Sequence, residues 1–136
     1  MLSKKDIEAI RQELDNCQNP LFFFDDDPDG LCSFLLLYRY KGEGSGVVVK
    51  AKPSLNGSFV RKVEEYDPDK IFIVDVPVVE QEFVDAVKRP VVWVDHHTPV
   101  ELNKVKYFNP RLKESSDGTC LTRLCYEVVQ QDLWIA

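Results

Sequence analysis

Short, uninterrupted apolar runs recur along this chain and restrict its fold more than any other feature. The clearest are residues 21–24, 71–74 and 91–94, in which aromatic, aliphatic and β-branched side chains follow one another without a polar residue. Such residues favour strands, and a strand that is apolar on both faces must be covered on both faces. The three runs therefore predict buried, parallel strands of one sheet.

Segments with helical spacing separate these runs. Ser3 and Asp6 indicate the start of a first helix, which should stop before residues 16–20. The other expected elements are helices at residues 31–40, 59–66, 79–87 and 119–131, a strand at 46–49 and an edge strand at 105–108. This alternation predicts an α/β fold, a mostly parallel sheet with helices on both faces. Because no linker-like segment interrupts it, residues 1–136 should form one domain.

The overall charge does not by itself identify a partner. The chain has 17 basic and 23 acidic residues, a net charge of −6, which argues against a simple basic surface for nucleic acid. Many of the acids, however, gather in one predicted site, where bound cations would neutralise several of them. No apolar run approaches the roughly 20 residues of a membrane helix. No secretory signal follows Met1, so we expect a cytoplasmic protein without a membrane partner.

The cysteines give no sign of a metal site. They are scattered, and no C-x-x-C pair occurs among them. This spacing argues against a zinc site or a disulfide framework and favours buried free thiols. The residues concerned are Cys17, Cys32, Cys120 and Cys125.

Each of the three buried strands runs into acidic residues. The side chains that follow them are Asp25, Asp27 and Asp29 after the first, Asp75 after the second, and Asp95, His96 and His97 after the third. A single such aspartate is often only a turn or a cap, but ligands in open α/β sheets gather outside the carboxyl ends of the strands. Clustered carboxylates stay ionised only with cations between them. Oxygen ligands with one or two imidazoles suit Mn²⁺ or Mg²⁺ better than Zn²⁺.

The three motifs, in this order and each after a strand, resemble motifs one to three of the DHH superfamily of phosphoesterases. They are Asp27-Pro28-Asp29-Gly30, Asp75 and Asp95-His96-His97. The superfamily includes RecJ exonucleases, nano-RNases, cyclic-dinucleotide phosphodiesterases and type II pyrophosphatases. The loop at residues 25–30 is most similar to the RecJ branch, and the chain looks like an archaeal relative. The resemblance covers most of the chain and implies hydrolysis with two metal ions.

The resemblance also assigns the metal ligands. Asp27 would bind one metal ion and Asp29 the other, and Asp75 would bridge the two ions. His96 would be a further ligand of the second ion. Two Mn²⁺ or Mg²⁺ ions are expected in the complete site.

Other residues of the motifs have different expected roles. His97 would face the substrate phosphate, and Asp95 would orient the histidines. Many members of the superfamily have a histidine four residues before the first aspartate of motif one, where this chain has Phe23. Asp25, an acid found in RecJ-like loops, would supply the missing metal ligand.

Two features of the superfamily are expected to be missing from this chain. The fourth motif, another metal-binding aspartate, normally follows the helix expected at residues 119–131, and the chain stops at Ala136, apparently just before it. The carboxy-terminal domain that holds the substrate is also absent. We therefore expect the 136-residue chain alone to hydrolyse its substrate poorly or not at all.

The implied function is that of a Mn²⁺-dependent phosphodiesterase acting on single-stranded DNA or RNA or on short oligonucleotides, as a monomer or a dimer. One alternative is a weakly catalytic or non-catalytic binding module of a replication assembly, like Cdc45-type relatives. Another is a pyrophosphatase or phosphomonoesterase with the same ligands. The intact motifs favour an enzyme, because a scaffold has no reason to keep a cluster of like charges. The missing fourth motif favours the scaffold.

Overall fold

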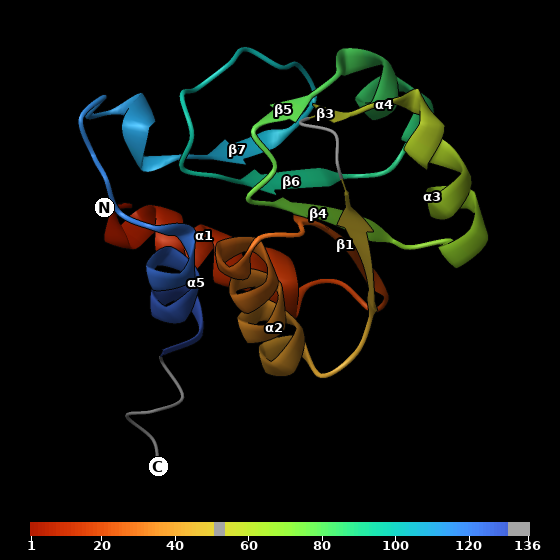
Figure 1. Cartoon of the computed structure of the whole chain (residues 1–136). Coiled ribbons are helices and arrows are strands. Elements are labelled where there is room, and N and C mark those ends of the chain that lie inside the picture. Colours follow the sequence, from red (N-terminus) through yellow and green to blue (C-terminus); the bar gives the residue numbers. More distant parts are fainter. Residues whose placement is uncertain (51–53, 131–136) are drawn as a thin grey trace.

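A five-stranded parallel sheet forms the centre of the molecule in the computed structural model, which describes residues 1–50 and 54–130 (Figure 1). The strand order is β2-β1-β4-β6-β7. The strands are β1 (Pro20–Asp25), β2 (Ser45–Val49), β4 (Lys70–Val74), β6 (Val91–Val94) and β7 (Lys106–Phe108). A second, two-stranded parallel pair consists of β3 (Ser54–Leu55) and β5 (Val78–Val79). The predicted parallel α/β fold is confirmed.

Helices cover both faces of this sheet. In Figure 1, α1, α2 and α5 lie below the sheet, and α3 and α4 lie on its other side. The helices are α1 (Lys4–Asp15), α2 (Pro28–Lys41), α3 (Val60–Tyr66), α4 (Gln81–Val87) and α5 (Leu121–Val129), with short 3₁₀ turns η1 (Gly57–Phe59) and η2 (Pro110–Leu112). The expected start of α1 is confirmed, because the Ser3 side chain accepts a hydrogen bond from the Asp6 amide at 3.1 Å.

Alternate residues of each strand pack into two separate cores. Phe22 of β1 packs with α1, α2 and α5, whereas the neighbouring Phe23 packs with α3 and α4. The same alternation places Val92 of β6 in the first core and Trp93 in the second, where its indole nitrogen donates to the Val76 carbonyl oxygen at 3.0 Å. Both faces of the strands are therefore buried, which explains why their sequences are apolar at every position.

The order of the strands creates a switch point between β1 and β4. From β1 the chain crosses to β2 on one side, and it then returns to β4 on the other side of β1. In doubly wound sheets such a reversal opens a crevice at the carboxyl ends of the two strands, where ligands bind. Asp25 is the last residue of β1 and Asp75 directly follows β4, so acidic residues lie at this point.

Some predicted boundaries are corrected. Helix α2 begins at Pro28 rather than residue 31, because Asp27 caps it and a proline suits the first helical position. Val79, expected in a helix, belongs to β5 and pairs with Leu55, so α4 starts at Gln81. Helix α5 begins two residues later than expected, and residue 131 of that prediction lies outside the described residues.

The prediction of buried thiols holds for two of the cysteines. Cys17 and Cys125 are buried, but Cys32 and Cys120 are exposed, the first within α2 and the second just before α5. All four are free thiols, as expected. Across residues 1–50 and 54–130, no helix has the length and apolar character needed to cross a membrane.

Candidate metal centre

The turn between β1 and α2 delivers the first acidic residues. Asp27 is the N-cap of α2, and its Oδ1 accepts the Gly30 amide hydrogen at 2.7 Å. A Cβ atom at Gly30 would lie 2.2 Å from the Asp25 carbonyl oxygen, so only glycine allows the helix to start this close to the strand. The tight turn keeps the carboxylates of Asp25 and Asp27 near the end of β1.

Asp75 occupies a strained and fully buried position. Its backbone has φ 63°, in the left-handed region, and the residue is 0% exposed. Its Oδ2 is buried without a hydrogen-bond partner among the described residues. An unpaired carboxylate oxygen in the interior is costly unless a cation accompanies it. Burial raises the pKa of Asp75 to about 6, and the nearby Asp27 and Asp29 add to this effect, whereas a hydrogen bond with His96 opposes it.

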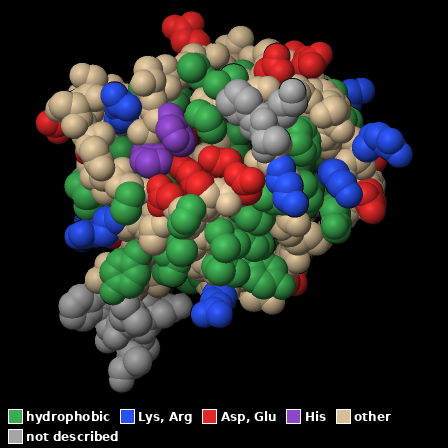
Figure 2. Space-filling view, viewed as in Figure 1, with side chains coloured by type: hydrophobic (Ala, Val, Ile, Leu, Met, Phe, Trp, Pro, Cys, Tyr) green, Lys and Arg blue, Asp and Glu red, His purple; other side chains and the backbone are tan. Residues whose placement is uncertain are grey.

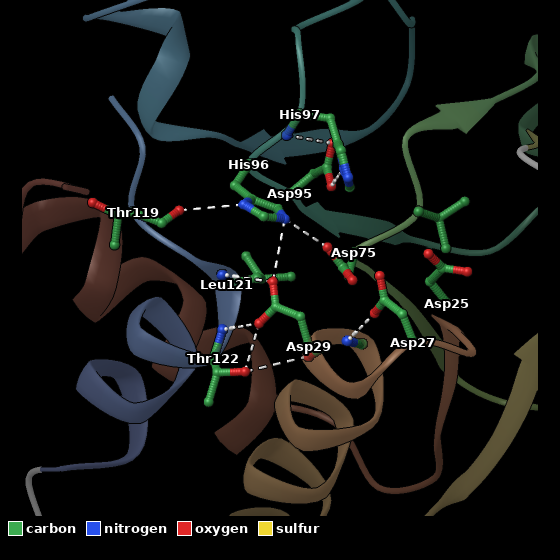
Figure 3. Close-up of polar contacts among 12 residues, drawn as sticks. Asp25, Asp27, Asp29, Asp75, Asp95, His96, His97, Thr119, Leu121 and Thr122 are labelled. Atoms are coloured by element: carbon green, nitrogen blue, oxygen red, sulfur yellow. Dashed lines mark hydrogen bonds and ion pairs between the residues drawn. The ribbon is translucent and has the colours of Figure 1, made fainter. Parts of the chain in front are cut away.

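His96 lies between Asp75 and Asp29. Its Nε2 is 2.8 Å from Asp75 Oδ1 and 3.3 Å from Asp29 Oδ2, and its Nδ1 is 3.2 Å from the Thr119 carbonyl oxygen (Figure 3). A carbonyl oxygen only accepts, so Nδ1 carries a hydrogen and Nε2 is the nitrogen free for a proton or a metal ion. The hydrogen bond with Asp75 raises the pKa of His96, against the effect of burial.

His97 is held in a different way. Its Nδ1 lies 2.7 Å from Oδ1 of the fully buried Asp95, and its backbone amide donates to Asp95 Oδ2 at 3.2 Å. This contact fixes the ring and leaves Nε2 free. Burial raises the pKa of Asp95, although the charge and hydrogen bond of His97 oppose the shift. Asp95 therefore holds the ring of His97, and its role in orienting the histidines during a reaction stays a prediction.

Asp29 is bound by the last helix of the described chain. Its carboxylate accepts from the Leu121 amide at 3.1 Å, from the Thr122 amide at 2.8 Å and from the Thr122 hydroxyl at 2.5 Å. Burial alone would raise the pKa of Asp29, but these hydrogen bonds outweigh it and hold the pKa below its usual value. Sequence reasoning missed this contact, because no local signal links residues more than 90 positions apart.

Most of the predicted ligands form two groups that share one residue. Asp25, Asp27 and Asp75 have ligand atoms within 4.8 Å of one another, and so do Asp75, Asp95, His96 and His97. Asp29 is in neither group, although it touches His96. Figure 2 shows the two histidines, in purple, directly beside a cluster of red acidic side chains on the molecular surface. Two adjoining sets of candidate ligands therefore meet at the buried carboxylate of Asp75.

Fold and site together define an α/β domain with a carboxylate–histidine centre, able to bind divalent metal ions, at a topological switch point. A family model described as "DHH family, N-terminal domain" matches residues 21–135. The chain therefore belongs to the DHH family. The archaeal origin that we expect from the sequence stays a prediction.

Solved structures share the fold. Exonuclease RecJ bound to manganese matches with a TM-score of 0.70 and 16% identity, over 95% of this chain and 37% of that one. RecJ from Thermus thermophilus, in complex with Mn²⁺, matches with a TM-score of 0.69 and 17% identity, over 96% of this chain and 21% of that one. This chain thus spans much less than half the length of either structure. No curated protein matches its sequence.

Proposed function

We propose that this chain forms the metal-binding part of a Mn²⁺-dependent phosphodiesterase that hydrolyses single-stranded nucleic acid or short oligonucleotides. The observation that carries the proposal is Asp75, which is shared by both ligand groups and has a buried oxygen with no hydrogen-bond partner in the described part of the chain. The RecJ structures with manganese support the choice of ion. The oxygen-rich ligand set suits the same ion.

The donor set fits a pair of hard divalent cations. Asp25 and Asp27 would hold one ion, His96 the other, and Asp75 would contact both, which gives its unpaired oxygen a partner. Asp29 remains a candidate ligand of the second ion, because its Oδ2 lies beside His96 Nε2. Oδ2 accepts one hydrogen bond from α5, from the Leu121 amide, and so keeps a lone pair for an ion, whereas Oδ1 accepts two hydrogen bonds from Thr122.

Two Mn²⁺ ions, when bound, would activate a water molecule and stabilise negative charge on the phosphoryl group. The histidines of this chain would contribute in separate ways. The hydrogen bond from Nδ1 to Thr119 orients His96 toward the ions. His97, fixed by Asp95 and partly exposed, would present Nε2 to a non-bridging oxygen of the substrate phosphate.

The acidic cluster also bears on the alternative of a non-catalytic scaffold in a replication assembly. Asp75 and Asp95 are fully buried, and burial raises the pKa of both. A protein that never bound cations would gain stability by losing one of these acids. Their presence favours an enzyme with bound metal.

The proposal is tested by Mn²⁺-dependent cleavage of a single-stranded oligonucleotide. We would compare the 136-residue chain with the protein encoded by its complete reading frame. If that reading frame extends past residue 136 and encodes a substrate-holding domain, the longer protein should cleave better than the 136-residue chain. Asp27→Ala should abolish cleavage, whereas Asp26→Ala should not, because Asp26 is exposed and belongs to neither ligand group.

Failure of the longer protein to cleave, despite bound Mn²⁺, would favour the replication-scaffold function. Cleavage of pyrophosphate or phosphomonoesters but not of oligonucleotides would favour the alternative function of a pyrophosphatase or phosphomonoesterase. Equal cleavage by Asp27→Ala and the parent would contradict the metal site itself.

A further inference from the structure

A cleft of about 550 Å³ opens beside the two histidines. This volume is within the range of about 300–1,000 Å³ found for small-molecule sites. Part of its wall is apolar, with Val78 exposed by 40% and Val100 by 38%. Exposed valines next to a polar centre form a surface on which the uncharged part of a ligand can be buried. The ligand would have to carry such a part.

The wall of this cleft also carries a positive charge. It comes from Arg111, the basic residue among the described residues that line the cleft. Its Nε donates to the Ser115 carbonyl oxygen at 2.9 Å, which orients the guanidinium group. The contacts of the described residues leave both terminal nitrogens without a protein partner. A planar group with two free nitrogens is suited to a phosphate, which it can bind through two parallel hydrogen bonds.

The position of Arg111 relative to the metal centre is fixed by a buried side chain. Asn109 is 3% exposed, and its Nδ2 donates to the His97 carbonyl oxygen at 2.8 Å. Its Oδ1 accepts from the Arg111 amide at 2.9 Å, which caps η2. The side chain of Asn109 therefore connects the backbone at His97 to the backbone at Arg111 through two hydrogen bonds. A group held at Arg111 would have a defined place beside His97.

Among the described residues, Asp117 is the acid of the cleft wall outside the metal centre, and it does not cancel the charge of Arg111. Asp117 accepts a hydrogen bond from the Thr119 amide at 2.9 Å and forms an ion pair with the amino group of Met1. Its side chain is 8% exposed. Its charge is already compensated, so the guanidinium group remains available for an anion.

We propose that this cleft binds the nucleotide next to the scissile phosphate, with Arg111 holding a second phosphate group and the valines contacting the sugar or base. The inference rests on the proposed function, which supplies the scissile phosphate at the metal centre. The inference also favours an oligonucleotide over pyrophosphate as the substrate. Pyrophosphate has no apolar part to cover Val78 and Val100, whereas an oligonucleotide uses both the cation and the apolar wall.

The test is calorimetric titration of the 136-residue chain with a deoxythymidine tetranucleotide and, separately, with pyrophosphate. Mn²⁺ is present, and the length of the tetranucleotide is checked afterwards. Arg111→Gln should weaken tetranucleotide binding by roughly 10- to 100-fold. It should also flatten the slope of log K against log salt by about 0.7, the effect of one lost phosphate contact on a single strand.

Two further variants separate a lost contact from damage to the fold. Lys113→Gln removes an equal charge two residues away, outside the cleft, and should bind like the parent. Val78→Asp should weaken binding of the tetranucleotide more than binding of pyrophosphate. A parent chain that binds no tetranucleotide, or Arg111→Gln binding with the parent affinity and salt slope, would overturn the inference.

Pyrophosphate binding as tight as that of the tetranucleotide would also overturn it, by removing the role of the apolar wall. Failure of the proposed function looks different. In that case binding depends on Arg111, but no Mn²⁺-dependent cleavage follows in the longer protein.

Discussion

Replacement of Asp75 by asparagine should have opposite effects on stability in the absence and in the presence of Mn²⁺. Asparagine keeps the shape of the side chain, and its Oδ1 can still accept a hydrogen bond from His96. Its amide nitrogen replaces Oδ2, which has no hydrogen-bond partner within residues 1–50 and 54–130, and can donate to the neighbouring Asp27 carboxylate. The substitution therefore removes a buried charge without leaving a cavity.

The size of the effect without metal follows from the pKa of Asp75, which burial raises from 3.8 to about 6. Below the ordinary pKa the carboxyl is protonated in the folded and the unfolded chain, and its contribution to stability is fully present. That contribution is lost as the pH rises through 6, because the folded state must then ionise a buried group. The loss amounts to roughly 3 kcal/mol at pH 8. Asp75→Asn should recover about 1 to 3 kcal/mol of it.

With Mn²⁺ the order should reverse. A ligand at 1,000 times its Kd stabilises the folded state by about 4.1 kcal/mol, which exceeds the 1 to 3 kcal/mol that the substitution recovers. The parent should gain this stability, and the variant, which lacks the shared ligand, should gain little. In a chain of this size each kcal/mol corresponds to about 4 °C in Tm. The difference is therefore large enough to measure by thermal unfolding.

The assay is thermal unfolding of both proteins at pH 4 and pH 8, in EDTA and in excess Mn²⁺. In EDTA the variant should melt above the parent at pH 8, and the difference should shrink at pH 4. Asp26→Asn, an exposed change in the same acidic loop, is the control and should follow the parent. The reasoning would be refuted if the variant melted below the parent in EDTA at pH 8. It would also be refuted if Mn²⁺ raised the Tm of the variant as much as that of the parent.

His96→Ala should lose Mn²⁺ affinity while His97→Ala retains it, because only His96 touches Asp75; calorimetry above the ordinary imidazole pKa of about 6.5 compares them. Gly30→Ala should lower stability to urea unfolding by roughly 1 to 3 kcal/mol, since its Cβ would overlap the preceding strand, and an unchanged midpoint would contradict this. Thr122→Val should raise the pKa of Asp29, followed by NMR titration, and cost about 1 to 3 kcal/mol at neutral pH. This last cost should disappear as the pH falls through the folded pKa of Asp29, because the protonated carboxyl loses its charge-assisted hydrogen bonds in parent and variant alike.

The parallel sheet could be predicted because its strands are buried on both faces. Residues such as Phe22 and Phe23 are apolar in succession only because each faces a different core. The proximity of Asp25, Asp27 and Asp75 could be predicted from the parallel strands as well, since the carboxyl ends of parallel strands lie at one edge of a sheet. Periodicity and topology were sufficient for these features.

Helix starts and long-range contacts were harder to predict. The beginning of α2 was missed because apolar spacing starts at residue 31, although Asp27 followed by Pro28 was a usable capping signal. The hydrogen bonds from α5 to Asp29 and from Asn109 to His97 join residues that are distant in sequence and meet only in the folded chain. The exposure of Cys32 could not be predicted either. Helix α2 carries apolar residues such as Leu31 and Leu35 on its exposed side, so its sequence does not show which side is buried.

The attachment of Asp29 to α5 affects the order in which the site can be assembled during synthesis. A nascent chain that has emerged only through β6 and the histidines after it already contains the acids of the centre, but not the donors at Leu121 and Thr122. Contacts between such distant residues form late, since a long loop must first close. The carboxylate of Asp29 therefore stays unanchored until translation has passed α5. Its fixed orientation toward His96 is acquired only after that helix has left the ribosome.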